Sequence, residues 1–105
     1  MRLTKAMELA DEDARPRLAP HVRLTYSAAR GEYALLSPET IWVINATGAA
    51  IVELCDAQRT IAEISAELRD RYDQVAENDI RSFVANLVTK HGMEVNHGKA
   101  LRVTR

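Results

Sequence analysis

The side chains best suited to metal or redox chemistry are few and scattered along the chain. There is one cysteine, Cys55, and there are three histidines, His21, His91 and His97. A protein zinc site needs several such ligands at short spacings, and no histidine stands at such a spacing from another or from Cys55. An iron–sulfur cluster needs more than one cysteine thiolate. We therefore predict no metal site and no bound cofactor.

Residues that could form a catalytic site show no recognisable arrangement either. The serines lie in no nucleophile-elbow or triad-like motif, and the four glycines are too dispersed for a phosphate-binding loop. Glu53 and Asp56 are close in sequence, but they fall at an expected helix end, where solvation explains two carboxylates. We predict no catalytic residue and a binding module rather than an enzyme.

The composition sets the class of protein. A chain of 105 residues with 47% hydrophobic and 28% charged residues is sufficient for one globular domain with a modest core. The net charge of −1 gives no overall signal for nucleic acid or anionic lipid. One cysteine excludes an intrachain disulfide, no apolar run reaches membrane-spanning length, and the acidic start does not resemble a signal peptide. We expect a cytoplasmic protein.

Three short strands are predicted in the first half of the chain. Residues 21–27 alternate between apolar and polar side chains, which is typical of a half-buried strand. Residues 32–37 form a second strand, and the β-branched residues around Trp42 predict a third over 40–44. Pro38 favours a tight reversal between the second and third strands. The short connections predict an antiparallel meander.

Two helices should follow the meander directly. Thr47 is a candidate N-cap for a short helix over residues 48–55. Thr60 and Glu63 have the spacing of a capping box, which marks the start of the second helix. Its apolar stripe consists of Ile61, Ile64, Leu68 and Tyr72.

The third helix has the strongest periodic signal in the chain. Apolar residues recur at helical spacing over residues 79–91, and Gly92 is placed to end the helix. The stripe consists of Ile80, Phe83, Val84, Leu87 and Val88. Pattern alone favours a core role for this stripe.

Both ends of the chain lie outside this predicted domain of residues 16–92. Residues 1–15 are predicted to be a flexible arm, and Pro16 and Pro20 are expected to break any regular element between residues 15 and 20. Residues 93–105 are predicted to form either a short terminal hairpin around residues 97–99 or a flexible tail.

Two motifs stand out in residues 16–92. One is Leu35-Leu36-Ser37-Pro38-Glu39 in the expected turn, and the other begins at Asn45-Ala46-Thr47 and ends at Leu54-Cys55-Asp56. Both resemble the PqqD family of pyrroloquinoline quinone biosynthesis, the prototype of peptide-recognition domains in modified-peptide pathways. Ala57 departs from the pattern, because these proteins usually carry glycine after the aspartate.

The resemblance implies an α+β, winged-helix-like domain in which a three-stranded antiparallel sheet precedes three helices. It implies a peptide chaperone that binds a ribosomally made, PqqA-like precursor and presents it to a PqqE-like radical S-adenosylmethionine enzyme, which crosslinks a glutamate and a tyrosine. The peptide would add as a strand beside the third strand and lie against the third helix. The positions implied are Thr40, Ile41, Trp42, Val43, Ile44, Ile80, Phe83, Val84, Leu87 and Val88.

The residues are compatible with that role and with others. A meander leaves an edge strand whose unpaired backbone groups can receive a peptide strand. We expect alternate residues of the third strand to enter the core and the others to line a groove, although a period of two does not say which. The same edge, or exchange of N-terminal segments, could produce a homodimer. A winged-helix DNA-binding protein is the alternative function, although the third helix carries few cations.

Overall fold

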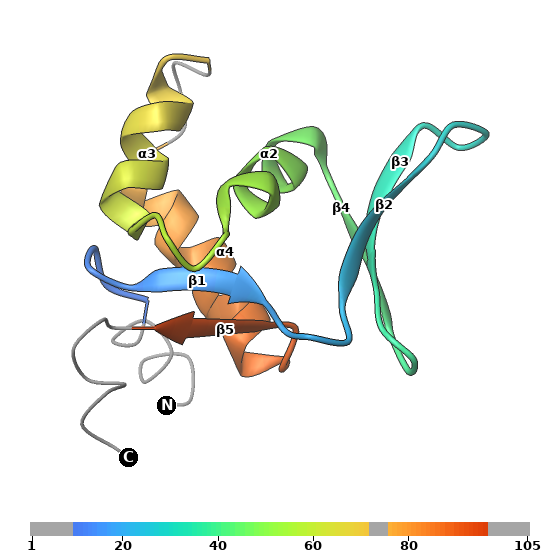
Figure 1. The fold of residues 1–105 in the computed structure, drawn as a ribbon. Helices are drawn as coiled ribbons and strands as arrows, with labels where there is room; N and C mark the ends of the chain where they lie inside the picture. Colours follow the sequence, from blue (N-terminus) through green and yellow to red (C-terminus); the bar gives the residue numbers. More distant parts are fainter. Residues whose placement is uncertain (1–9, 72–75, 97–105) are drawn as a thin grey trace.

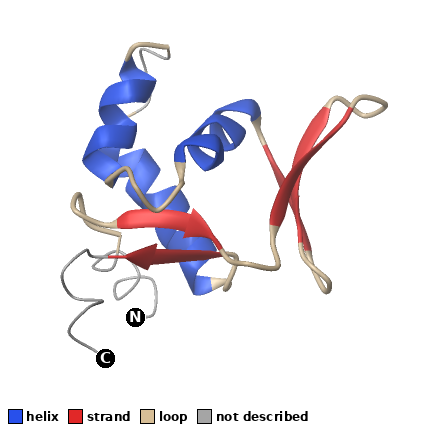
Figure 2. Ribbon diagram, viewed as in Figure 1, coloured by secondary structure: helices blue, strands red, loops and turns tan. Residues whose placement is uncertain are grey.

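A three-stranded antiparallel sheet projects to one side of three helices in this protein (Figures 1 and 2). The structure is a computed structural model that describes residues 10–71 and 76–96. The strand order is β2-β3-β4, and short turns join the strands. These strands are β2 (Arg23–Ser27), β3 (Glu32–Leu36) and β4 (Ile41–Ile44).

The three helices follow β4 in chain order, as the sequence predicted. They are α2 (Ala46–Leu54), α3 (Ile61–Arg69) and α4 (Glu77–Thr89). α2 contacts β3, β4 and α3, and α3 contacts α4, so α2 joins the sheet to the helical part. The predicted α+β class, with a three-stranded sheet before three helices, is confirmed.

A second sheet of two strands was not predicted. β1 (Arg15–Leu18) pairs antiparallel with β5 (Met93–Asn96), and Arg17 opposite Glu94 forms an ion pair of 2.9 Å. The expectation that the two prolines break regular structure over residues 15–20 is therefore wrong. Pro16 is tolerated because a strand of a two-stranded sheet needs N–H groups on one side only. The other half of the predicted terminal hairpin lies outside the described residues.

The segment before β1 packs against the helices. Ala10 and Ala14 have no exposed surface. The first two N–H groups of α3, from Ile61 and Ala62, donate to the carbonyls of Ala14 (2.9 Å) and Glu12 (3.1 Å). Helix N-termini leave such donors unpaired, so this segment completes the start of α3. The packed part of the chain thus begins at least as early as Ala10, inside the predicted arm; residues 1–9 are not described.

Two helix ends differ from prediction and one agrees. The N-cap of α2 is Asn45 rather than Thr47, because Asn45 Oδ1 accepts the Gly48 N–H at 2.7 Å. At the end of α4, His91 rather than Gly92 adopts the left-handed conformation, with φ 66°. The N–H groups of His91 and Gly92 then donate back to the carbonyls of Val88 and Leu87. The capping box that begins α3 is confirmed.

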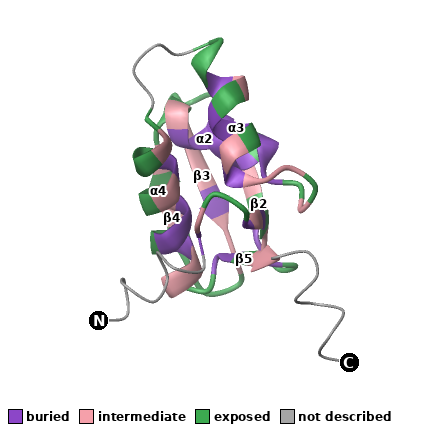
Figure 3. Ribbon diagram, turned by 90° about the vertical axis from the view of Figure 1, so that its left-hand side faces the viewer, coloured by how far each residue is buried: buried purple, intermediate pink, exposed green. Residues whose placement is uncertain are grey.

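The core lies where the three helices meet one another and the inner face of the sheet (Figure 3). Leu35 of β3 and three residues of the predicted α3 stripe have no exposed surface. Tyr72, the fourth residue of that stripe, lies outside the described residues. The core also includes Val84 from α4, and Trp42 and Ile44 pack against it from β4. This packing places β4 at the edge of the sheet nearest α4.

Candidate functional site

The side chains of β4 divide cleanly between the two faces of the sheet. Ile41 and Val43 are 67% and 63% exposed, whereas Trp42 and Ile44 are half-buried and pack against the core. The alternation of faces is as predicted, and the structure decides its phase. The expected division between core residues and groove residues is wrong, because the core-facing Trp42 and Ile44 also line the groove described below, together with Val43. Trp42 is the cross-strand partner of the buried Leu35, so the inner face of β4 continues the inner face of β3.

The backbone of β4 presents one free edge. The Ser37 N–H donates to the Thr40 carbonyl at 2.9 Å across the turn that precedes β4. Hydrogen-bonded and non-hydrogen-bonded pairs alternate along an antiparallel ladder. The N–H and C=O groups of Trp42 therefore point toward β3, and those of Ile41 and Val43 point outward. Within the described residues, no strand pairs with this outward edge.

A groove of about 290 Å³ runs beside that edge, between β4 and α4. Five of its eight lining residues are apolar, and two amides and one ammonium group complete it. β4 and the residue after it contribute one wall, and α4 and its C-cap contribute the other. The lining residues are Trp42, Val43, Ile44, Asn45, Phe83, Asn86, Leu87 and Lys90.

Two glycines give the aromatic side chains of this groove their room. A Cβ on Gly48 would lie 3.0 Å from Cε1 of Phe83, and a Cβ on Gly92 would lie 3.3 Å from Cη2 of Trp42. Both distances are shorter than most real Cβ contacts, so a methyl group at either position would have to push the facing ring by a few tenths of an ångström. The position of both rings therefore depends on elements outside the groove.

The predicted site residues do not all come together in the groove. Five of the ten line it, and they come from both walls: Trp42, Val43, Ile44, Phe83 and Leu87. Ile80 and Val84 have no exposed surface and serve the core in this conformation. Val88 is half-buried against the core outside the groove, and Thr40 lies in the turn before β4. Ile41 is exposed on the outer face of the sheet.

Sequence reasoning missed three polar residues of the groove. Asn45 was singled out only as part of a motif, and Asn86 and Lys90 were not singled out as site residues. Asn86 and Lys90 follow Phe83 by three and seven residues, which places all three on one face of α4. That spacing could have revealed both residues once Phe83 was chosen as a site residue.

The one thiol of the chain, that of Cys55, lies outside the groove and is buried. Burial, and secondarily the charge of Asp56, raises the pKa of Cys55 to about 12, and the Cys55 thiol donates to the Ile51 carbonyl at 3.1 Å. In residues 10–71 and 76–96, no three metal-ligating side chains gather. None of the helices in these ranges is long and apolar enough to span a membrane.

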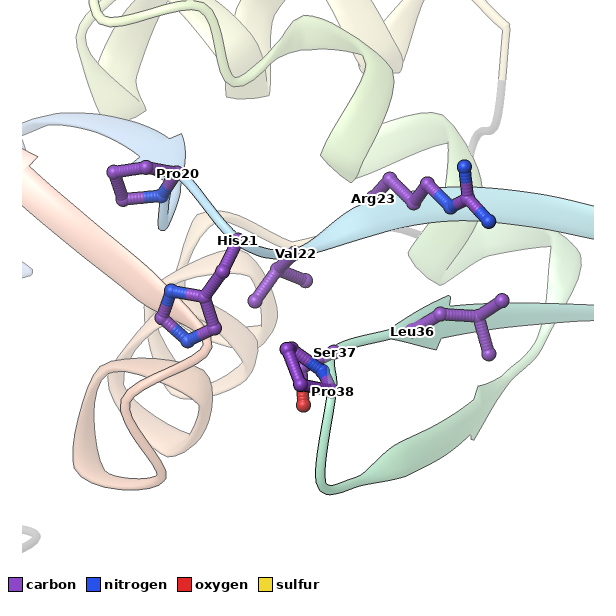
Figure 4. Close-up of a pocket in the computed structure, with 7 residues that line it drawn as sticks. All are labelled: Pro20, His21, Val22, Arg23, Leu36, Ser37 and Pro38. Carbon is purple, nitrogen blue, oxygen red and sulfur yellow. The ribbon is translucent and has the colours of Figure 1, made fainter.

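A second hollow, of about 440 Å³, lies where β2 begins, beside the turn between β3 and β4. Its polar groups do not converge, since Figure 4 shows the Arg23 guanidinium and the His21 imidazole pointing away from each other. The rest of the lining includes Pro20, Pro38 and Leu36. The groove beside β4 is the better candidate, because it combines apolar side chains with a free backbone edge.

A small sheet with an open edge beside an apolar groove defines a binding domain of the kind that accepts an extended segment. The family model described as coenzyme PQQ synthesis protein D (PqqD) matches residues 32–91, which is more than half of the chain. The chain belongs to the PqqD family. The residues matched include β3, β4, all three helices and the whole groove.

Individual relatives agree with this assignment. The PqqA binding protein of Methylococcus capsulatus is 37% identical over 68 residues, which cover 64% of this chain and 73% of that protein. The PqqA binding protein of Rhizobium meliloti is 32% identical over 82 residues, covering 75% and 84%.

A solved structure is also similar. It is the solution NMR structure of the PqqD truncation of Methylobacterium extorquens PqqCD, described as a functional and stand-alone recognition element for ribosomally synthesized and post-translationally modified peptides. It aligns with a TM-score of 0.66 at 32% identity, covering 75% of this chain and 87% of that one. At this identity the similarity extends to the sequence as well as the fold.

Proposed function

We propose that this protein binds a PqqA-type precursor peptide as an additional strand along the free edge of β4, without catalysing a reaction itself. The observation that carries the proposal is the free edge of β4, where the backbone groups of Ile41 and Val43 point outward beside the groove. A peptide strand at this edge would satisfy those groups, and alternate side chains of the peptide would reach the groove.

Two further observations support a peptide as the occupant. The relatives from Methylococcus capsulatus and Rhizobium meliloti are named for binding PqqA. The groove wall also has the composition expected for side-chain recognition, with Trp42 and Phe83 as large apolar surfaces and two amides nearby. An apolar surface with a few placed polar groups is typical of ligand sites.

The second part of the proposed role is presentation of the bound peptide to a radical S-adenosylmethionine enzyme. This part rests on the family resemblance. In it, the chain supplies affinity and orientation, and the partner enzyme supplies the chemistry. The candidate surface for that enzyme is whatever the bound peptide leaves uncovered.

Hydrogen exchange of individual backbone amides tests strand addition directly. With saturating PqqA peptide, exchange at Ile41 and Val43 should slow by about tenfold or more, because their N–H groups gain partners. By the same alternation, Leu24 and Tyr26 point to the opposite edge of the sheet, at β2, and provide an internal control that should not change. Peptide binding without protection of Ile41 and Val43 would refute strand addition.

A second copy of the chain could occupy the same edge and form a homodimer, in competition with the peptide. Two β4 edges could pair in the absence of peptide, and the peptide would then displace the second copy. Exchange of N-terminal segments is the other dimer that we considered, but Ala10 and Ala14 pack within their own chain. Sedimentation with and without peptide distinguishes these cases, since only an edge-paired dimer should dissociate when peptide binds.

The DNA-binding alternative receives little support from α4. Arg81 is one of two cations on this helix and its C-cap, and its Nε donates to the Ala10 carbonyl at 3.0 Å. Lys90, the other one, sits at the end of the helix. Groove reading by a helix normally requires several phosphate and base contacts.

A further inference from the structure

We propose that the groove selects a peptide by a carboxylate as well as by an apolar side chain, with Lys90 as the residue that recognises the carboxylate. This inference rests on the proposed function and adds the chemical class of the bound segment. The apolar side chain would lie on Phe83, and the acidic side chain would lie at the opposite end of the groove.

The two ends of the groove are defined by the glycine contacts. Phe83 lies against Gly48, just after Asn45, so it marks the end of the groove where α2 begins. Trp42 lies against Gly92, which follows Lys90 by two residues, so Lys90 and Trp42 share the other end. α4 and β4 therefore run in opposite directions along the groove.

Among the described residues, Lys90 gives its end of the groove a positive charge that no ion pair compensates. It is the one charged residue among the eight that line the groove. Its side chain is exposed, and it forms no ion pair with any residue of 10–71 or 76–96. The acidic residues of α4 lie in its first turn, about 16–20 Å away along the helix. A ligand carboxylate is the group that would complement this charge.

The last carbonyls of α4 do not need the Lys90 ammonium group as a hydrogen-bond donor. The last carbonyls of α4 are capped by backbone donors, since the Lys90 N–H donates to Asn86 and the Gly92 N–H donates to Leu87. The Lys90 side chain is therefore available to a ligand. The Asn86 amide, one turn earlier on the same face, can donate a second hydrogen bond to the same carboxylate.

Strand geometry fixes the spacing that the peptide should have. Phe83 and Lys90 are seven residues apart, about 10 Å along the helix. A strand advances about 3.3 Å per residue, and every second side chain faces the groove. An apolar residue on Phe83 and an acidic residue near Lys90 should therefore be two or four positions apart.

Trp42, the only tryptophan, lies in the groove and provides a fluorescence signal for titration with PqqA peptide. We expect Lys90→Met to weaken binding about two- to fivefold at about 0.05 M salt, and the loss to shrink at about 0.5 M salt. Lys90→Arg should bind like the unaltered chain. Arg69→Met removes one exposed charge from the end of α3 and should leave binding unchanged.

Variants of the peptide, combined with Lys90→Met, form a double-mutant cycle. Each acidic residue of the peptide is replaced singly by its amide, and one such variant should lose the same factor with the unaltered chain but nothing further with Lys90→Met. If Lys90→Met binds as tightly as Arg69→Met, or if no peptide position couples to Lys90, the carboxylate inference is overturned while the proposed function stands. If the unaltered chain binds no PqqA peptide, both are overturned.

Discussion

Gly92 lies against the indole ring of Trp42, and a Cβ on Gly92 would lie 3.3, 3.5 and 3.5 Å from three carbons of that ring. The contact joins the second residue after Lys90, the C-cap of α4, to the middle of the edge strand. It explains a glycine at a position where the helix end does not require one, because His91 rather than Gly92 adopts the left-handed conformation.

We expect Gly92→Ala to displace Trp42 and to lower the free energy of unfolding by about 1 kcal/mol, as for other overpacked sites. A shift in tryptophan emission should accompany the loss. The cost should become smaller in a Trp42→Phe background, since the smaller ring leaves room for the added methyl group. Equal costs in both backgrounds, measured by chemical denaturation, would show that the contact is unimportant.

Ala57 adopts φ 67° in the turn between α2 and α3. A left-handed conformation costs an L-residue about 1–2 kcal/mol, and glycine gives back part of that gain as unfolded-state entropy. Ala57→Gly should therefore stabilise the protein by about 0.5–1 kcal/mol and raise the melting temperature by about 2–6 °C.

A matched control for this change is Ala66→Gly, on an exposed position of α3. The same chemical replacement should destabilise there, by about 1 kcal/mol, because the backbone is helical. Thermal melts should show a higher melting temperature for Ala57→Gly and a lower one for Ala66→Gly. Destabilisation by Ala57→Gly would contradict the strain that we assign to this turn.

Asp56 should make stability depend on pH in the acid range. The N–H groups of Arg59 and Gln58 donate to its carboxylate and, with the Arg59 guanidinium at 2.8 Å, hold the pKa of Asp56 below its usual value. Because the pKa is lower in the folded state, the carboxylate stabilises the fold above the unfolded pKa, near 4, and this contribution is lost as pH falls through the folded pKa.

Melting temperatures between about pH 5 and pH 2 measure this contribution of Asp56. Asp56→Asn should flatten the acid part of the curve, since the amide oxygen can keep the turn while the titrating charge is gone. Glu53→Gln, which removes an exposed carboxylate from α2, should leave the curve nearly unchanged. A curve for Asp56→Asn that follows the unaltered chain would contradict this account.

Cys55 should resist alkylation in the native protein. Burial raises the pKa of its thiol to about 12, and the thiolate is the reactive form. Near pH 8, iodoacetamide should therefore modify the folded chain far more slowly than the same chain in denaturant. Mass spectrometry of timed samples measures both rates, and rapid labelling of the native chain would show that the thiol is accessible.

Local features of the sequence were sufficient for much of the fold. Thr60 and Glu63 form the predicted capping box, and the apolar stripe of α4 places Ile80 and Val84 in the core as pattern alone favoured. These signals are reliable because they depend on residues three or four positions apart in one helix. The five predicted residues that line the groove come from two elements with a clear periodicity, β4 and α4.

The features that were missed depend on residues far apart in the chain. Pairing of β1 with β5 brings Arg17 beside Glu94, and no local rule connects them. The local rule for proline argued against a strand at Pro16, and the partner strand and the bridge from Arg17 to Asp56 overrode it. His91 likewise takes the conformation expected of the glycine that follows it.

The sequence by itself determined that this chain has a short third strand and an amphipathic third helix, because periodicity and turn chemistry are local. Only the tertiary structure decided which side chains of that strand meet the groove. A period of two fits either face equally well, and packing of Trp42 against Gly92 and Leu35 selects one of them. The same packing turns the backbone groups of Ile41 and Val43 outward, where a peptide strand can reach them.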